Sequence, residues 1–564
     1  MKKHITRLLF AALLLLALCI GASAAGTSGK CGPSAYWSFD SSTGTLTISG
    51  SGAMNDYEYG DYPWMDYRDS IQTIVIGDQI TQIGRYAFTG TACSTIKFGK
   101  NVRSIGERAF LECRNLNGDL TLPDSVQTIG AGAFQGCEKL SGDLTIPDSV
   151  VEIGEGAFRD CKNLNGTLTL GKNLRTIGKE AFSGCAFTGS LTIPEGVTEI
   201  ADSAFGAGIP LKKYGMFTGT LTLPSTLKTI GASAFSYADF SGELLIPDGV
   251  TSIGANAFEE CDGFGGTLSL PDSVKTVGEW AFYLCKGFTG LKLSAGLTKI
   301  EKLSFAHMYG LKTEVVIPEG VTEIGESAFQ CSHMPSVRFP STLKKIGKEA
   351  FYFSLNCKIA FPDGLEVIED EAFALCNVKS AVILPASIKS IGKKAFDSDW
   401  SYGKHNDIPL GAYFLGAAPQ LVGTGNANCS FPSDWTLNYL PGTSGWMGDT
   451  YEGYKIVPWD GETRWDNLYT DDFGYRDNKW NKIETSWSVN PDTGKITLTD
   501  DLNEGCVVAV SYDAEGRVTS IGVLRTKTDS VRLNLQDTCR LFLLNASSAP
   551  RLNTPVTIND YLPT

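Results

Sequence analysis

The chain has 564 residues, of which 42% are hydrophobic and 20% are charged, and this composition excludes a wholly disordered protein. Its formal net charge is −14. Because an acidic surface repels phosphate backbones, nucleic acid is excluded as an expected partner. The 62 glycines indicate a turn that recurs many times along the chain.

Residues 1–25 have the pattern of an export signal. Basic side chains at positions 2, 3 and 7 precede an apolar run over 8–20, and Ala22-Ser23-Ala24 fits the A-x-A cleavage pattern. The apolar run is shorter than a membrane-spanning helix requires. Cys19 offers the alternative of a lipid anchor, but Leu18 stands where lipid-modification sites need a small residue. We expect a mature protein that is secreted or lies at the cell surface, without a stable membrane span.

Residues 26–75 predict an N-terminal β cap. Residues 37–40 and 45–50 alternate apolar and polar side chains, and Ser42-Thr43-Gly44 provides a turn between them, so the two runs predict a hairpin. Residues 71–76 then lead into the first repeat. A cap is expected because an open repeat array exposes apolar surface at both ends.

One hexapeptide organises residues 76–405. It occurs fourteen times at intervals of 22 to 24 residues, with one step of 30 between Phe205 and Phe235, and such self-similarity predicts a stacked repeat architecture. The copies are IGRYAF (83–88), IGERAF (105–110), IGAGAF (129–134), IGEGAF (153–158), IGKEAF (177–182), IADSAF (200–205), IGASAF (230–235), IGANAF (253–258), VGEWAF (277–282), IEKLSF (300–305), IGESAF (324–329), IGKEAF (346–351), IEDEAF (368–373) and IGKKAF (391–396).

Residues 120–137 illustrate one unit. Leu120 and Leu122 alternate with polar neighbours, which predicts a strand with one buried face, and 126–129 predicts a second short extended segment. Ala133, Phe134 and Cys137 are placed on one side of a short helical turn. Each unit has too small an apolar interior to fold alone, so we expect the units to stack as parallel coils.

This unit resembles the BspA-type leucine-rich repeat of exported bacterial proteins. The matching string is LTIPDSVVEIGEGAFRDC at 144–161, and the similarity covers about 75–405. The resemblance implies a right-handed α/β solenoid of about fourteen repeats, each with parallel strands and a short helical turn. It also implies a secreted or cell-surface location and a role in adhesion or recognition, but no enzyme, and it names no ligand.

The C-terminal third departs from the repeat. Residues 406–461 are similar to the segment that closes many proteins of this family, so we expect a C-terminal cap, followed by a linker over 462–485. Strand-like runs at 506–512 and 517–524 flank a turn, and further runs follow at 531–535 and 540–544. Residues 486–564 therefore predict a small all-β module, similar to accessory modules of secreted bacterial proteins.

Fifteen cysteines in an exported chain require an explanation. Seven of them stand three residues after a repeat phenylalanine, and Cys331 is displaced by one position. This spacing predicts thiols stacked inside the solenoid as small buried hydrophobes. Disulfides between coils and metal ligation are the alternatives, although the C-x-x-C pairs typical of metal sites are absent from the sequence. Cys506 with Cys539 is a separate candidate bridge. The seven are Cys113, Cys137, Cys161, Cys185, Cys261, Cys285 and Cys376.

The sequence shows no catalytic motif. Of its four histidines, His4 leaves with the signal, and His307, His333 and His405 stand at repeat variations or after the last coil without a neighbouring Ser or Cys motif. Metalloprotease, nucleophile-elbow and phosphate-loop motifs are absent, and the acidic residues are scattered through the repeats. We expect no enzyme activity, no cofactor and no metal.

A row of outward positions beside the strands is the first candidate binding surface. Its threonines are explained by β-propensity and by a stabilising ladder, whereas its later members are basic or apolar. The insertion at 206–217 is a second irregular feature of the kind that often serves recognition. The row comprises Thr121, Thr145, Thr169, Thr192, Thr222, Leu245, Ser269, Lys292, Val316 and Arg338. The predicted partner-binding residues are Lys212, Lys213, Tyr214, Leu245, Lys292 and Arg338.

Aromatic residues near the C-terminus form the second candidate surface. If these residues are buried, they close the end of the solenoid. If they are exposed, they could stack on sugar rings. The leading hypothesis is an extracellular adhesion or interaction protein that presents its solenoid to a protein partner on a host or neighbouring cell. The alternatives are glycan or cell-wall binding through this aromatic region and an enzyme activity within 486–564. The tryptophans are Trp435, Trp446, Trp459, Trp465, Trp480 and Trp487.

Overall fold

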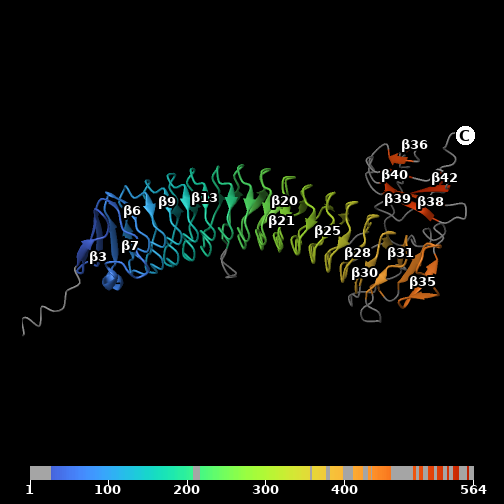
Figure 1. Cartoon of the computed structure of the whole chain (residues 1–564), viewed down its shortest axis with the longest axis horizontal. Helices are drawn as coiled ribbons and strands as arrows, with labels where there is room; N and C mark the ends of the chain where they lie inside the picture. Colours follow the sequence, from blue (N-terminus) through green and yellow to red (C-terminus); the bar gives the residue numbers. More distant parts are fainter. Residues whose placement is uncertain are drawn as a thin grey trace, which may run out of the picture. The chain divides into compact units, whose positions relative to one another are not determined.

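The computed structural model describes residues 27–206, 216–355, 359–376, 382–397, 411–422, 430–432 and 435–458, together with the backbone of seven strands between 487 and 557. The chain divides into two compact units, residues 1–264 and 265–564. Each unit contains short parallel strands wound as successive coils (Figure 1). The predicted solenoid of parallel strands is confirmed.

The first unit opens with the predicted hairpin. Its sheet contains β1 (Ser28–Lys30), β2 (Ala35–Asp40), β3 (Thr45–Gly50), β5 (Thr73–Ile76) and β7 (Thr95–Lys97). Strands β2 and β3 pair antiparallel, with buried and exposed residues alternating along β2, as a strand with one apolar face requires. Strand β3 then pairs in parallel with β5, and β5 with β7. The hairpin therefore forms one edge of the first coil's sheet.

Two ladders of very short strands build the coils of the first unit. One ladder contains β4 (Gly52–Ala53), β6 (Ile80–Ile83), β8 (Ser104–Ile105), β9 (Thr128–Ile129), β11 (Glu152–Ile153) and β13 (Thr176–Ile177), and it resumes with β15 (Glu199–Ile200), β17 (Thr229–Ile230) and β19 (Ser252–Ile253). The other contains β10 (Leu144–Thr145), β12 (Leu168–Thr169), β14 (Leu191–Thr192), β16 (Leu221–Thr222) and β18 (Gly242–Leu245). Equivalent repeat residues face each other, for example Ile129 and Ile153, so the register follows the sequence repeat.

The second unit repeats this plan. Its first ladder contains β23 (Lys299–Ile300), β25 (Glu323–Ile324), β27 (Lys345–Ile346), β28 (Val367–Ile368), β30 (Ser390–Ile391) and β32 (Gln420–Leu421), and β21 (Thr276–Val277) has the equivalent position in the repeat before β23. Its other strands are β20 (Phe264–Ser269), β22 (Gly290–Lys292), β24 (Val315–Val316), β26 (Val337–Arg338), β29 (Val382–Leu384), β31 (Gly411–Phe414), β33 (Thr436–Tyr439), β34 (Thr450–Tyr451) and β35 (Tyr454–Pro458). Strands β29, β31, β33 and β35 pair in parallel. Parallel pairing thus continues beyond the last hexapeptide.

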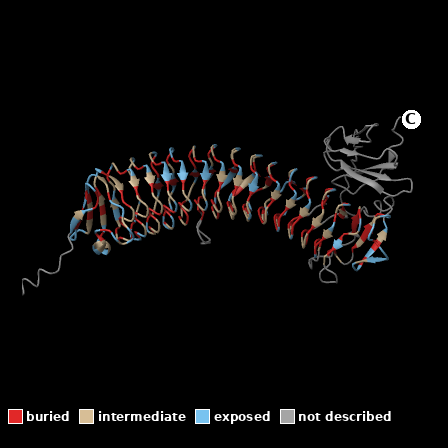
Figure 2. Cartoon of the chain, viewed as in Figure 1, coloured by how far each residue is buried: buried red, intermediate tan, exposed pale blue. Residues whose placement is uncertain are grey.

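A column of stacked phenylalanine rings forms the centre of each core. In the first unit the ring of Trp64 stacks on Phe88, and the hexapeptide phenylalanines follow with centroids 5.1 to 5.6 Å apart. The longer step from Phe205 to Phe235 leaves the column unbroken at 5.6 Å. In the second unit the column runs from Phe282 with steps of 5.3 to 5.7 Å. Buried residues accordingly line the interior of every coil (Figure 2).

The predicted short helical turn of each repeat is wrong. The fourth residue of the hexapeptide has a positive φ in copy after copy, such as 52° at Arg108 and 56° at Glu180, which no α-helical turn allows. Successive backbone N–H groups of this turn donate alternately within the turn and to the next coil. Ala109 donates to Gly106 in its own turn, whereas Phe110 donates to Ala133 of the next coil. Among the described residues the only helix is the 3-10 helix η1 (Met65–Ser70).

Strands near the C-terminus pair antiparallel. They are β36 (Trp487–Asn490), β37 (Lys495–Leu498), β38 (Cys506–Tyr512), β39 (Val518–Leu524), β40 (Ser530–Arg532), β41 (Thr538–Leu544) and β42 (Val556–Thr557). The expected pairing of the runs at 506–512 and 517–524 is present as β38 and β39.

The candidate disulfide between Cys506 and Cys539 is wrong. In the register of β38 and β41, Cys506 faces Leu544 and Cys539 faces Ser511. The two cysteines are therefore separated by roughly 17 Å along the strands, beyond the reach of a disulfide.

Candidate interaction surfaces

The outward row beside the strands is exposed throughout the described coils, as the alternation of the sequence predicts. In the first unit Thr145 faces Thr169 and Thr192 faces Thr222 across parallel strand pairs, while the leucines beside them are buried. Side chains directly opposite each other on neighbouring strands stabilise a sheet. These threonines are therefore accounted for by the fold.

The row also contains exposed residues that are not threonine. Leu245 on β18 is 72% exposed, which leaves an apolar side chain in water. In the second unit Lys292 and Arg338 are exposed on β22 and β26, and Arg338 makes a 2.8 Å ion pair with Glu314. Val316, opposite Arg338, is 45% exposed. Three of the predicted partner-binding residues thus lie on solvent-facing strand positions, whereas Lys212, Lys213 and Tyr214 lie outside the described residues.

The cysteine column is buried, and its thiols point at backbone carbonyls. Cys137, Cys161 and Cys185 each donate from Sγ to the carbonyl oxygen of the phenylalanine one coil earlier, at 3.2 Å. That oxygen also accepts the backbone N–H of the cysteine in its own coil, for example from Cys137 to Phe134. Each thiol therefore occupies the second lone pair of a buried carbonyl, so the column has a structural role.

These thiols are poorly suited to nucleophilic or metal chemistry. Burial raises the pKa of Cys113, Cys161 and Cys185 above the ordinary thiol value, and the thiolate is the reactive and metal-binding form. Cys113, Cys161 and Cys185 are not joined in disulfides. Among the described residues, no group of three or more His, Cys, Asp or Glu side chains converges to hold a metal.

At the start of the array, polar groups of aromatic residues cap the first complete coil. In later coils, three carbonyls accept N–H groups from the preceding coil. They belong to the third and fifth residues of the hexapeptide and to the residue that follows the phenylalanine. In the first coil these acceptors belong to Arg85, Ala87 and Thr89. The Tyr57 backbone N–H, the Trp64 Nε1–H and the Tyr62 hydroxyl donate to them at 3.0, 2.9 and 2.6 Å.

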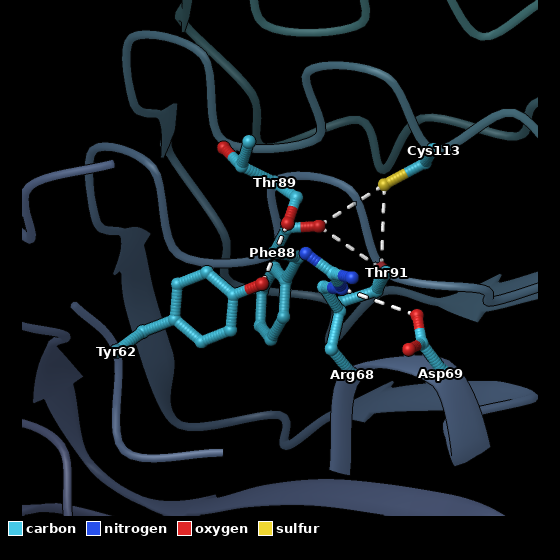
Figure 3. A network of polar contacts seen from close by, with 7 residues as sticks. All are labelled: Tyr62, Arg68, Asp69, Phe88, Thr89, Thr91 and Cys113. Atoms are coloured by element: carbon cyan, nitrogen blue, oxygen red, sulfur yellow. Dashed lines mark hydrogen bonds and ion pairs between the residues drawn. The ribbon is translucent and has the colours of Figure 1, made fainter. Parts of the chain in front are cut away.

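The close view of this end shows how the cap joins the thiol column. The Tyr62 hydroxyl points to the Thr89 carbonyl, and Thr91 Oγ1 and Cys113 Sγ both reach the Phe88 carbonyl (Figure 3). Tyr62, Thr91 and Cys113 each reach a backbone oxygen, as expected of groups that cap a repeat end. The exposed pair of Arg68 with Asp69 lies at its edge.

The described tryptophans near the C-terminus are buried. Trp435 is 5% exposed and stacks on Phe431, whose ring stacks in turn on Phe396. The Tyr454 hydroxyl accepts the Phe431 N–H at 2.9 Å and donates to the Phe431 carbonyl at 2.8 Å. Trp446 is 8% exposed. These rings are unavailable for sugar stacking, while Trp459, Trp465, Trp480 and the Trp487 side chain lie outside the described residues.

The sequence reasoning missed a group of half-exposed rings in the second unit, which we call the ring strip. Neighbouring members have ring centroids 4.6 to 5.5 Å apart. Neighbouring members are 2 or 3 residues apart within one turn or 20 to 24 residues apart between coils, so no short motif reveals them. Aligning the repeats would have shown aromatic residues at positions that carry glycine or charge in other coils. The ring strip consists of Trp280, Tyr283, His307, Tyr309, His333 and Phe353.

Three solved structures illustrate the similarity of the chain to known proteins. A leucine-rich repeat protein from Bacteroides ovatus is 22% identical, with a TM-score of 0.45 over 67% of this chain and 93% of that one. A leucine-rich repeat protein from Eubacterium ventriosum is 23% identical, with a TM-score of 0.36 over 68% and 98%. A leucine-rich cell surface protein from Faecalibacterium prausnitzii is 28% identical, with a TM-score of 0.36 over 56% and 89%.

A comparison with curated proteins gives no match. No helix within the described residues is both long and apolar enough to cross a membrane. The BspA type leucine-rich repeat region matches in six copies that lie within residues 62–142, 117–219, 141–264, 213–330 and 288–402. The resemblance noted from the residues is thereby confirmed, and the chain belongs to the family of proteins with BspA-type leucine-rich repeats.

Proposed function

We propose that the protein is a secreted or cell-surface interaction protein that binds a protein partner through the outward face of its strands and catalyses no reaction. The observation that supports this most directly is the exposure of strand residues other than threonine, Leu245 in the first unit and Lys292 and Arg338 in the second. Exposed apolar and arginine side chains on a rigid scaffold are the residue types that dominate protein interfaces. The inward positions of the same strands are occupied by buried core residues.

The domain boundaries expected from the sequence belong to this proposal. Residues 1–25 act as a cleaved export signal, 26–75 and 406–461 cap the repeats of 76–405, and a linker over 462–485 leads to a small all-β module at 486–564. The buried Trp435 and Trp446 favour the cap over glycan binding for the described part of 406–461. A catalytic activity in 486–564 stays a prediction, because the side chains there lie outside the described residues.

The proposal is tested by capture from a library of extracellular proteins on the immobilised chain beginning at residue 26. Leu245→Asp, Lys292→Glu and Arg338→Glu are expected to weaken the captured protein's affinity at least tenfold, equivalent to about 1.4 kcal/mol. Lys275→Glu is the matched control, because Lys275 is exposed outside the row, immediately before β21. Capture that is insensitive to all three row variants would refute the strand face as the binding surface.

A further inference from the structure

The ring strip differs from the same surface in other coils. His307 and Phe353 stand two residues after the hexapeptide phenylalanine, where earlier coils have Glu112, Gly136 and Asp160. Tyr309 and His333 stand four residues after it, where earlier coils carry a charge, as at Glu138 and Lys162. Because coils with glycine or charge at these positions fold in the same way, the fold does not require rings there.

The rings form a continuous and partly solvent-facing path. Tyr309 is 41% exposed, His333 is exposed, and the other members are half-buried. Ring centroids are 5.5 Å apart from His307 to Tyr309, 5.4 Å from Tyr309 to His333 and 5.1 Å from His333 to Phe353. These steps are comparable to the length of one sugar unit in an extended oligosaccharide.

The rings are held in place by contacts with one another. His307 Nδ1 and the Tyr309 hydroxyl are 2.5 Å apart, and Tyr283 meets His307 edge to face with centroids 5.1 Å apart. Positive φ angles of 60° at His307 and 49° at His333 restrict the backbone that carries them. Such preorganisation lowers the entropy lost when a ligand binds.

Two lysines in the coils that carry the strip are paired with carboxylates. Lys302 pairs with Glu326 at 3.0 Å, and Lys348 pairs with Glu349 at 3.1 Å. Burial, together with Lys286 and His333, lowers the pKa of His307. A ring surface bordered by hydroxyl and imidazole groups suits a ligand with apolar C–H faces and hydroxyl edges, whereas the acidic chain disfavours nucleic acid.

We propose that the ring strip of the second unit is a binding site for a neutral oligosaccharide. The C–H faces of successive sugar units pack against the rings, since aromatic surfaces accept any ligand with a flat apolar face. Sugar hydroxyls hydrogen-bond to the Tyr309 hydroxyl and the His333 ring. This site is separate from the strand residues of the proposed protein interface and does not depend on that function.

The test is calorimetric titration of the whole chain with soluble neutral hexasaccharides of β-1,3-linked glucose, β-1,4-linked glucose and N-acetylglucosamine. At least one of them is expected to bind. Tyr309→Ala and His333→Ala are each expected to lower the affinity about tenfold. Tyr309→Phe retains the ring and should therefore lower the affinity less than Tyr309→Ala does. Thermal unfolding midpoints of the variants, compared with the unaltered chain, show that the coils remain folded.

Tyr59→Ala is the matched control, because Tyr59 is a 65% exposed tyrosine of the first unit. The Tyr59→Ala and Lys292→Glu variants should both bind the sugar with the affinity of the unaltered chain. The proposal is overturned if no hexasaccharide binds, or if binding survives both alanine substitutions. It is also overturned if Tyr309→Ala abolishes capture of a protein while sugar binding is absent, because the strip would then be a protein interface.

Discussion

Two serines show what the repeat requires at the cysteine position. Ser332 and Ser354 stand three residues after Phe329 and Phe351, in register with the buried cysteines. The Ser332 hydroxyl donates to the Phe305 carbonyl at 2.7 Å, and the Ser354 hydroxyl donates to that of Phe329. A small side chain with one donor therefore satisfies this position, and thiol chemistry is not needed.

We expect Cys161→Ser to destabilise the protein less than Cys161→Ala does. Alanine leaves the Phe134 carbonyl with one bond fewer and leaves a small void, whereas serine retains a donor, so the difference in the free energy of unfolding should be about 1 kcal/mol. Denaturant titration of both variants measures it. Equal losses for serine and alanine would show that the thiol contributes through packing alone.

The sequence predicts where the cysteines are, but not what their thiols do. The three-residue spacing after phenylalanine correctly indicates burial of Cys113, Cys137 and Cys161. It does not reveal the carbonyl acceptor, because that atom belongs to the previous coil. For the same reason Cys331 looked like a displaced member of the column, although Ser332 occupies its place.

At the scale of the element, the phenylalanine column of each unit makes a continuous contact between its coils. We expect Phe158→Ala to destabilise the protein by about 3–5 kcal/mol, because its ring stacks on Phe134 and Phe182 and is fully buried. Phe158→Leu should cost less, since it fills more of the space. Hydrogen exchange read by mass spectrometry should show faster exchange confined to the coils around Phe158.

Val151→Ala is the control for the phenylalanine substitutions. Val151 lies in the same coil but is 42% exposed, so its truncation should change stability by no more than about 0.5 kcal/mol. If Phe158→Ala had an equally small effect, the stacked rings would not be the main source of cohesion between coils.

The turn after each first-ladder strand is the element that the sequence predicted least well. The spacing of Ala133, Phe134 and Cys137 suits one face of a helical turn as well as it suits the observed turn. The two turns differ at the residue before the alanine, whose backbone is left-handed in the observed turn. Glycine at positions 132 and 156 is the feature of the sequence that indicates this conformation. Other repeats have Arg108 or Glu180 in the same left-handed conformation, so the sequence does not show glycine consistently at this position. The hydrogen bonds between coils override the preference of these residues for a negative φ.

Carboxylates at one edge of the coils make stability depend on pH. Asp148 accepts the Lys172 backbone N–H at 3.0 Å and its ammonium at 2.7 Å, and these contacts lower the pKa of Asp148. Backbone N–H groups of the next coil likewise lower the pKa values of Asp78 and Glu195. A carboxyl group with a lowered pKa in the folded state stabilises it above the unfolded-state pKa.

Stability should therefore fall as the pH drops from about 5 towards 3, through the lowered folded-state pKa values. The triple variant Asp78→Asn, Asp148→Asn, Glu195→Gln retains an acceptor oxygen at each place but cannot titrate. Its thermal midpoint should change less steeply over this pH range than that of the unaltered chain. Identical pH profiles would assign the acid sensitivity to other groups.

At the scale of the whole molecule, the repeat determined the architecture and the irregular segments determined its ends. The hexapeptide alone predicted parallel coils and their register. It could not predict that Trp64 and Phe431 extend the ring columns, because neither lies in a copy of the motif. The ring strip also escaped, since its members come together only after the coils stack.

The N-terminal segment should control whether the array stays free of self-association. A chain that begins at residue 72 lacks β3, the partner of β5, and lacks the donors from Tyr57, Tyr62 and Trp64 that cap the first coil. An uncovered parallel edge and an exposed Phe88 ring favour pairing with a second chain. Size-exclusion chromatography with light scattering should therefore give a larger mass than for the chain beginning at residue 27, at equal concentration. Trp64→Phe retains an aromatic ring over Phe88, so this variant of the longer chain should have the same mass as the unaltered longer chain. If the deletion did not increase the mass per particle, the first coil would need no cover.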